Sequence, residues 1–249
     1  MVRKKSNYKK ALVILGPTTT GKTEVAFELA QRLDGEVING DKFYLFSDLK
    51  LSTGLSDSFY YNKIPHHLYQ ILKPAAESLS LVDYLLLVNP LIPKILARNR
   101  LPIIEGCSYG YTKALMDLNK LSKEPLYGPF VGLRFPRNYN VHTKIEKRID
   151  QLFEEGLTSE VERALDKSYR YSYPMRKGVI ILPVLELLEG KIDEKAAKDK
   201  IIVGMLEAMY STLRKFLDVP NINWIEHSHE NLENTISLIY KFIKRENKV

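Results

Sequence analysis

The residues best suited to chemistry form one motif near the start of the chain, with the spacing G-x-x-x-x-G-K-[ST]. The apolar run 11–15 precedes it, and apolar residues at helical spacing follow it from Val25 to Leu33. A strand–loop–helix of this kind points backbone N–H groups and a helix N-terminus at one anion, and the lysine adds a point charge. We therefore predict a phosphate-binding loop formed by Gly16, Pro17, Thr18, Thr19, Thr20, Gly21, Lys22 and Thr23.

A divalent cation belongs to this prediction. The hydroxyl of Thr23 is the kind of group that holds Mg²⁺ beside a bound diphosphate or polyphosphate. In nucleotide hydrolases a second carboxylate ends a later apolar run, where this chain offers Glu105. The loop by itself therefore predicts phosphate binding, and it does not imply nucleotide hydrolysis.

Asp41 is the next candidate, because it follows the expected strand 36–39 closely and would face the loop. An aspartate at this point can hold a metal through water, accept a hydrogen bond from an amine substrate, or cap the helix that follows. The residues alone leave these three roles open.

Strands that alternate with helices must position these side chains. We expect strands at 11–15, 36–39, 101–105 and 131–135, an amphipathic helical stretch from Val141 to Leu165, and two helices between Val179 and Leu217 separated by Gly190. This order predicts an α/β fold of the P-loop NTPase type, a parallel sheet with helices on both faces. Ligands of such sheets bind beyond the carboxyl ends of the strands. The loop, Asp41, the segment 105–108 and Arg134 should then surround one crevice.

Composition and charge limit the remaining possibilities. The 249 residues carry a formal net charge of +7, of which positions 1–10 supply five and positions 241–249 supply three, so the middle of the chain carries −1. We expect one domain at 11–240 between two basic tails, 1–10 and 241–249. The single cysteine excludes an internal disulfide framework, and no apolar stretch is long enough to span a membrane. No cleavable signal is visible, so we expect a cytoplasmic protein without a membrane partner; its oligomeric state is not set by the sequence.

Five further segments resemble the isopentenyltransferases, the family of the tRNA dimethylallyltransferases and of the adenylate isopentenyltransferases of cytokinin synthesis. They follow the family's order along nearly the whole chain: 37–42 (VINGDK), 51–54 (LSTG), 65–68 (PHHL), 100–106 (RLPIIEG) and the helix that begins with 145–148 (IEKR). The resemblance implies transfer of a dimethylallyl group from dimethylallyl diphosphate to the N6 amine of an adenine, with Mg²⁺ as cofactor.

The resemblance also assigns roles by position. Asp41 is similar to the family's general base, Thr18 to the threonine that borders the reacting centre, and Lys22 and Thr23 to the holders of the diphosphate and of Mg²⁺. The rest of the loop and Arg134 would bind the diphosphate. On the acceptor side, the corresponding residues are Asp41, Ser52, Thr53 and Ser108.

The acceptor follows from a missing segment. The tRNA-modifying members carry a long helical insertion that grips the anticodon arm, whereas here only a short loop joins 111–118 to the strand at Val131. The chain therefore resembles the adenylate branch, and we expect free AMP, ADP or ATP as acceptor and do not expect tRNA. The alternatives are a tRNA adenosine dimethylallyltransferase, a P-loop small-molecule kinase, and a catalytically altered relative. A kinase should also show an Arg-rich lid or an apolar run ending in Asp, and neither is found.

Several positions depart from the family pattern. Two arginines of the family's Asp-Phe-Arg-Arg are missing in 83–86 (DYLL), and Cys107 takes the place of the second glycine of its GG[ST] turn. Basic side chains that could replace the lost charges are Arg134, Lys144, Arg148 and Arg176. His66 and His67 lack a partner at metal spacing, which predicts a hydrogen-bonded loop pair. Aromatic residues gather near the expected acceptor side: Phe43, Tyr44, Phe46, Phe59, Tyr60 and Tyr61.

Overall fold

The computed structural model describes residues 8–55, 63–167 and 169–246. Residues 1–7 and 247–249 of the expected tails lie outside this range, as do Phe59, Tyr60 and Tyr61.

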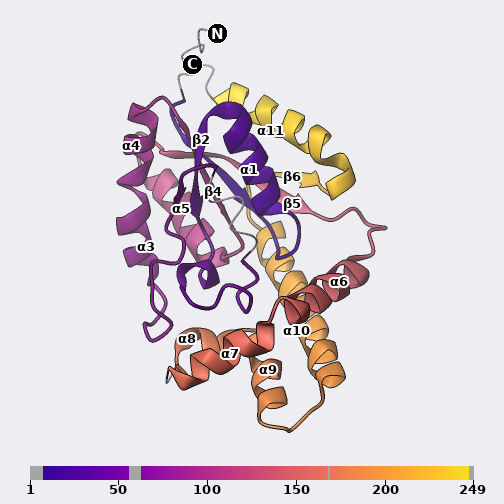
Figure 1. The fold of residues 1–249 in the computed structure, drawn as a ribbon. Helices are drawn as coiled ribbons and strands as arrows, with labels where there is room; N and C mark the ends of the chain where they lie inside the picture. The colour runs from indigo at the N-terminus through magenta and orange to yellow at the C-terminus, as the bar shows by residue number, and fades with distance from the viewer. Residues whose placement is uncertain (1–7, 56–62, 168, 247–249) are drawn as a thin grey trace.

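A six-stranded sheet forms the centre of the molecule, in the order β3-β2-β4-β1-β5-β6 (Figure 1). Every pair of neighbouring strands is parallel. The strands are β1 (Ala11–Leu15), β2 (Gly35–Asn39), β3 (His66–His67), β4 (Leu101–Gly106), β5 (Tyr127–Arg134) and β6 (Ile222–Glu226). All residues of β1, β2 and β4 are buried, as a parallel sheet covered on both faces requires. The predicted α/β class is confirmed.

Helices cover both faces of this sheet. On one face, α1 (Lys22–Leu33) and α11 (Leu232–Glu246) share a core with alternate residues of the strands. On the other face, α3 (Leu81–Val88), α4 (Leu91–Ala97) and α5 (Tyr109–Leu121) do the same (Figure 1). Because side chains alternate along a strand, Leu101, Ile103 and Glu105 of β4 all face the α1 side. This alternation positions one carboxylate of the site.

A separate cluster of helices extends beyond the carboxyl edge of the sheet (Figure 1). Its buried side chains form a third core of their own. The helices are α6 (Val141–Glu154), α7 (Leu157–Asp166), α8 (Tyr173–Lys177), α9 (Ile181–Leu188) and α10 (Glu194–Leu217). This cluster follows β5, whereas the connection between α5 and β5 comprises only residues 122–126.

The structure differs from the sequence-based expectations at several boundaries. The strand expected at 131–135 runs from Tyr127 to Arg134, and the stretch 141–165 divides into α6 and α7 at Gly156, whose φ of 96° favours glycine. Residues 241–246, expected in a basic tail, are the last turns of α11, because Ile239 and Ile243 are buried against the sheet. The edge strands β3 and β6 were not predicted. In the described ranges, no helix has both the length and the apolar character needed to cross a membrane.

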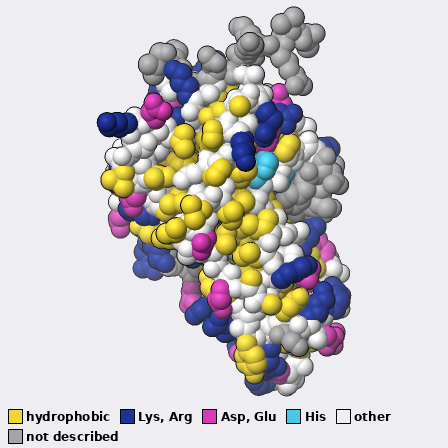
Figure 2. All heavy atoms as spheres, turned by 90° about the vertical axis from the view of Figure 1, so that its left-hand side faces the viewer, with side chains coloured by type: hydrophobic (Ala, Val, Ile, Leu, Met, Phe, Trp, Pro, Cys, Tyr) yellow, Lys and Arg dark blue, Asp and Glu magenta, His cyan; other side chains and the backbone are white. Residues whose placement is uncertain are grey.

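One outer face of the molecule is apolar. Figure 2 shows hydrophobic side chains gathered on the side that carries α3 and α4. On α3, Leu81, Val82, Leu86 and Leu87 are all exposed. The opposite side of this short helix carries Tyr84 and Val88, which are completely buried in the core.

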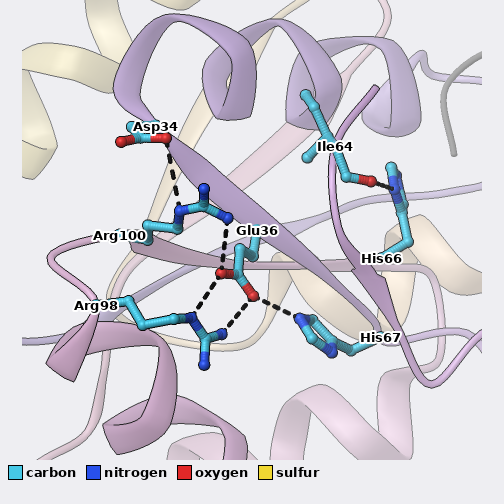
Figure 3. A network of polar contacts seen from close by, with 7 residues as sticks. All are labelled: Asp34, Glu36, Ile64, His66, His67, Arg98 and Arg100. Atoms are coloured by element: carbon cyan, nitrogen blue, oxygen red, sulfur yellow. Dashed lines mark hydrogen bonds and ion pairs between the residues drawn. The ribbon is translucent and has the colours of Figure 1, made fainter. Parts of the chain in front are cut away.

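A buried ion-pair network holds the edge strand β3 against the sheet (Figure 3). Glu36 of β2 is 1% exposed, and its carboxylate accepts hydrogen bonds from Arg98, Arg100 and His67. Burial raises the pKa of Glu36, but the hydrogen bonds from Arg98, His67 and Arg100 outweigh it, so the pKa is lowered overall. His66 lies in hydrogen-bond contact with the Ile64 carbonyl at 2.7 Å. Each histidine thus makes a hydrogen bond of its own, as expected, although the two residues form a short strand instead of a loop.

Candidate active site

The predicted phosphate-binding loop joins β1 to α1 at the carboxyl edge of the sheet. Thr19 and Gly21 have φ values of 65° and 83°, and such left-handed positions turn successive backbone N–H groups toward one side. Lys22 is 8% exposed, and its ammonium donates to the Pro17 carbonyl at 2.7 Å, while the Thr20 hydroxyl donates to the same carbonyl at 2.9 Å. The loop is therefore held in shape by its own side chains, with its lysine beside the bend.

A cavity of about 440 Å³ lies between this loop and α6. Thr18, Thr19, Gly21, Lys22 and Thr23 line one wall. The opposite wall includes three basic side chains of α6: Lys144, Lys147 and Arg148. Four cationic groups and a helix N-terminus around one space are an arrangement that favours anions, and the diphosphate pocket itself stays a prediction.

Asp41 lies just beyond β2, where two strands approach each other closely. A side chain on Gly106 would lie 2.2 Å from the Gly40 backbone, so only glycine allows this approach. Asn39 holds the Asp41 backbone, accepting from its N–H at 2.7 Å and donating to its carbonyl at 3.0 Å. The Asp41 carboxylate accepts from the Phe43 N–H at 2.9 Å and from the Cys107 thiol at 2.6 Å. One carboxylate oxygen therefore caps the next turn, and the other points toward Cys107.

A second cavity, of about 130 Å³, contains this carboxylate. Asp41, Phe43, Ser52 and Cys107 line it, together with Gly178, Val179 and Ala208. Both cavities share Thr18, Tyr44, Thr53, Ile180 and Met205, so the two spaces adjoin. Burial and the neighbouring Asp41 carboxylate raise the pKa of the Cys107 thiol well above its usual range, which keeps it a neutral donor. The arrangement places a cationic space and a space with a carboxylate on either side of Thr18.

Thr23 and Glu105 are the described residues best placed to hold a cation. The Thr23 hydroxyl donates to Glu105 Oε1 at 3.3 Å, and the Tyr69 hydroxyl donates to the same oxygen at 2.7 Å. Glu105 is completely buried, and its Oε2 has no hydrogen-bond partner. Burial raises the pKa of Glu105, although Lys22 and Tyr69 act in the opposite direction. Among the described residues no group of three or more His, Cys, Asp or Glu could hold a metal. A Mg²⁺ held by few protein oxygens and by phosphate is compatible with this donor set.

The residues expected to bind the acceptor are largely engaged in holding the site together. The Ser52 N–H donates to Glu160 of α7 at 2.8 Å, and its hydroxyl donates to the same carboxylate. Ser108 accepts from the Lys42 N–H at 2.8 Å, which fixes the segment after Asp41. Thr53 lines both cavities, with its hydroxyl donating to the Lys50 carbonyl at 3.2 Å.

Arg134 does not reach either cavity. Its guanidinium pairs with Glu226 of β6 at 3.3 Å, because the two residues are in register on neighbouring strands. Arg176 also lines neither cavity, and its guanidinium pairs with Glu77 at 2.9 Å. Of the basic side chains suggested as replacements, Lys144 and Arg148 lie in the cavity wall. A further cavity, of about 400 Å³, includes Lys10, Tyr127 and Pro220 in its lining and none of the predicted site residues.

Sequence reasoning missed several residues of the site. Lys147 lies on the same helix as two predicted basic residues, and its spacing from Lys144 could have indicated the shared face. Ile180 and Met205 read as core residues, and nothing in their pattern marks them as cavity-lining. His227, after β6, lies behind the loop, where a side chain on Gly21 would be 2.9 Å from its Nε2. Burial and Lys144 lower its pKa to about 4, so it is neutral.

Comparisons with known proteins give the family. The family model described as IPP transferase matches residues 45–128 and 122–207. The model described as isopentenyl transferase matches residues 9–63, which include the loop and Asp41.

Individual relatives cover the chain to different extents. Adenylate isopentenyltransferase 7 of Arabidopsis thaliana is 28% identical over 214 positions, which are 84% of this chain and 63% of that protein. The tRNA dimethylallyltransferase of Halalkalibacterium halodurans is 24% identical over 305 positions, which are 94% of this chain and 96% of that protein. The crystal structure of a full-length tRNA isopentenylpyrophosphate transferase from Bacillus halodurans matches 96% of this chain and 98% of its own, with a TM-score of 0.81 and 22% identity. The likeness to this solved structure shows the fold, and the matches to the two family models show the family. The chain belongs to the IPP transferase family.

Proposed function

We propose that this IPP transferase family member transfers a dimethylallyl group from dimethylallyl diphosphate to the N6 amine of an adenine. One observation carries the proposal. A cationic cavity at the phosphate-binding loop adjoins a smaller cavity that contains the Asp41 carboxylate, and Thr18 lines both. A diphosphate in the first cavity and an amine in the second would meet beside Thr18.

The donor side suits a departing diphosphate. When the C1–O bond of the allylic donor breaks, its electron pair stays on the diphosphate, so negative charge grows there. The Lys22 ammonium is held in place by the Pro17 carbonyl, and the loop and the basic residues of α6 line the same cavity. Such preorganised groups stabilise a transition state because they need not reorient as the charge develops.

The acceptor side suits a weak nucleophile. The N6 lone pair forms the new bond to C1, and the N6 proton must leave. The Asp41 carboxylate lines the second cavity and accepts from the Phe43 N–H, while Asn39 holds the Asp41 backbone, so the carboxylate can accept that proton without rearrangement. A positioned carboxylate in this role contributes about 10²–10⁴-fold to the rate. Phe43 and Tyr44 line the same cavity and offer apolar surface to a base.

Mg²⁺ is the proposed cofactor, with Thr23 as one of its holders. A bound Mg²⁺ would neutralise part of the charge that develops on the diphosphate oxygens. Thr23 is the second residue of α1, directly after Lys22, and it lines the cationic cavity, which is where such an ion would contact the loop.

The identity of the acceptor is the finer question. The expectation that tRNA is not a partner is unsupported, because a tRNA dimethylallyltransferase matches nearly the whole chain and the fold neighbours include an enzyme described as acting on tRNA. These relatives favour a tRNA adenosine as the acceptor. One contrast between the alignments favours a free adenine nucleotide. The alignment with the tRNA dimethylallyltransferase runs over 305 positions, more than the 249 residues of this chain, so many residues of that enzyme lie opposite gaps in this chain. The alignment with the adenylate isopentenyltransferase needs few gaps in this chain, since its 214 positions cover 84% of the chain.

Product analysis tests the proposal and separates the acceptors. The protein is incubated with dimethylallyl diphosphate, Mg²⁺ and, in separate reactions, AMP, ADP, ATP or unmodified tRNA, and the products are weighed by mass spectrometry. A dimethylallyl-adenine product in any of the reactions supports the proposed transfer, and the reaction that contains it identifies the acceptor. Absence of product in all four, from a protein that still binds inorganic pyrophosphate, would refute it.

A further inference from the structure

Among the described residues, one fully buried carboxylate lacks a complete set of hydrogen-bond partners. Glu105 is completely buried at the end of β4, and its Oε2 makes no hydrogen bond, whereas Oε1 accepts from Thr23 and Tyr69. A buried carboxylate oxygen without a partner is costly, and a cation is one of the few ligands that can satisfy it.

The other buried glutamate of the sheet makes the contrast clear. Glu36 lies on the neighbouring strand β2 and is only 1% exposed. Both of its carboxylate oxygens accept hydrogen bonds, and the donors are Arg98, Arg100 and His67. Glu36 therefore needs nothing further. Glu105 has only two neutral hydroxyl donors, and both approach the same oxygen.

The topology sends this incomplete carboxylate toward the phosphate-binding loop. β4 pairs with β1, with Glu105 opposite Ile14, and the alternation of side chains turns Glu105 to the face that carries α1. Thr23, in the first turn of α1, touches it at 3.3 Å. A threonine hydroxyl can donate its proton to a carboxylate and still bind a cation through its oxygen.

We propose that Glu105 is a residue of the Mg²⁺ site, acting together with Thr23 either by direct ligation or through one bound water. Mg²⁺ takes one or two carboxylates and otherwise waters and phosphate oxygens, and this site offers one carboxylate, one hydroxyl and the adjoining anion cavity. The inference rests on the proposed function for the identity of the anion as a diphosphate, but the cation contact can be measured separately.

Calorimetric titration with inorganic pyrophosphate, in buffer with Mg²⁺ and in buffer with EDTA, tests the proposal on the wild type, Glu105→Gln and Glu36→Gln. Glutamine keeps an oxygen that can accept from Thr23 and Tyr69. In EDTA, removal of a negative charge near the loop should leave pyrophosphate binding unchanged or tighter. In Mg²⁺, the same substitution should weaken binding at least about tenfold, the usual scale for residues that hold or orient a metal. Glu36→Gln is the matched control, and it should show the wild-type ratio between the two buffers.

A purely structural Glu105 gives a different pattern. It would change the pyrophosphate Kd equally in both buffers, and that result would overturn the proposal. Failure of the wild type to bind pyrophosphate in either buffer would instead refute the donor site. In that case titration of wild type and Glu105→Gln with Mn²⁺ alone, followed by electron paramagnetic resonance, still decides: equal affinities overturn the role of Glu105.

If Glu105→Gln does not fold, the wild type provides the test. Fe²⁺ bound in place of Mg²⁺ generates radicals with ascorbate and peroxide that cleave the nearby backbone, and mass spectrometry maps the cuts. Cleavage near both Thr23 and Glu105, suppressed by excess Mg²⁺, is expected. Cleavage elsewhere only would overturn the proposal.

Discussion

Replacing Asp41 with asparagine separates its proposed catalytic role from its structural one. In the wild type the Phe43 N–H donates to an Asp41 carboxylate oxygen at 2.9 Å. Asparagine keeps an oxygen that can accept this bond, and it caps a turn about as well as aspartate. The loss is confined to the negative charge beside Cys107 and the second cavity. We expect a folded protein whose unfolding free energy falls by no more than about 1 kcal/mol, or about 2–4 °C in Tm.

The kinetic effect should be far larger than the stability effect. If the carboxylate takes the N6 proton, its loss should lower kcat by about 10²–10⁴-fold, or about 3–5 kcal/mol of barrier. KM for the prenyl diphosphate should change little, because Asp41 lines only the second cavity. The assay is single-turnover transfer from radiolabelled dimethylallyl diphosphate, with thermal unfolding of the same samples.

Asp48→Asn is the matched control for this experiment. Asp48 lies in the same connection after β2 but pairs with Lys167 at 3.2 Å and lines neither cavity. Its φ of 65° is a conformation that asparagine accepts readily, so this variant should keep the wild-type kcat. A well-folded Asp41→Asn protein with a kcat close to wild type would remove Asp41 from the mechanism and leave it only its capping role.

Two further predictions concern charge. Lys22→Ala should lower kcat/KM by at least about 10²–10³-fold, because the departing diphosphate loses a fixed cation, and near-normal transfer would show that the loop is not the donor site. The lowered pKa of Glu36 means that its ion pairs stabilise the fold above the carboxyl's ordinary value of 4.5 and lose that effect as the pH falls through the lowered pKa. Urea unfolding from pH 7 to pH 3 should therefore show a loss of stability below about pH 4.5 that Glu36→Gln flattens, at a cost of about 1–3 kcal/mol at pH 7. Parallel pH profiles for the two proteins would contradict this.

The sequence was most informative where local pattern and tertiary role coincide. The strand Ala11–Leu15 is buried throughout, so its continuous apolar run has one simple interpretation. The division at Gly190 was also readable, and in the structure Asp193 caps the helix that follows it, α10, by accepting from the Ala196 N–H at 2.8 Å.

The parts that could not be predicted depend on pairing between distant segments. β3 has two residues, and β6 mixes polar and apolar residues on an edge, so neither carries a clear strand pattern. Arg134 lies near the carboxyl end of its strand as expected, but the position of β6 beside it supplies Glu226 as its partner. Glu160 looks like an ordinary surface residue of an amphipathic helix, and only the fold brings Ser52 to it.

The electrostatics of the site explain why its two halves come from different parts of the fold. Near the loop, the buried charges of Asp41 and Glu105 oppose that of Lys22, so the sheet edge alone is a poor site for a diphosphate. The additional positive charge comes from Lys144, Lys147 and Arg148 of α6. That helix belongs to the separate third core, not to the sheet. The proposed diphosphate site would therefore depend on how the helical cluster is held against the sheet edge, and the buried contact of Ser52 with Glu160 of α7 is one of the bonds that hold it there.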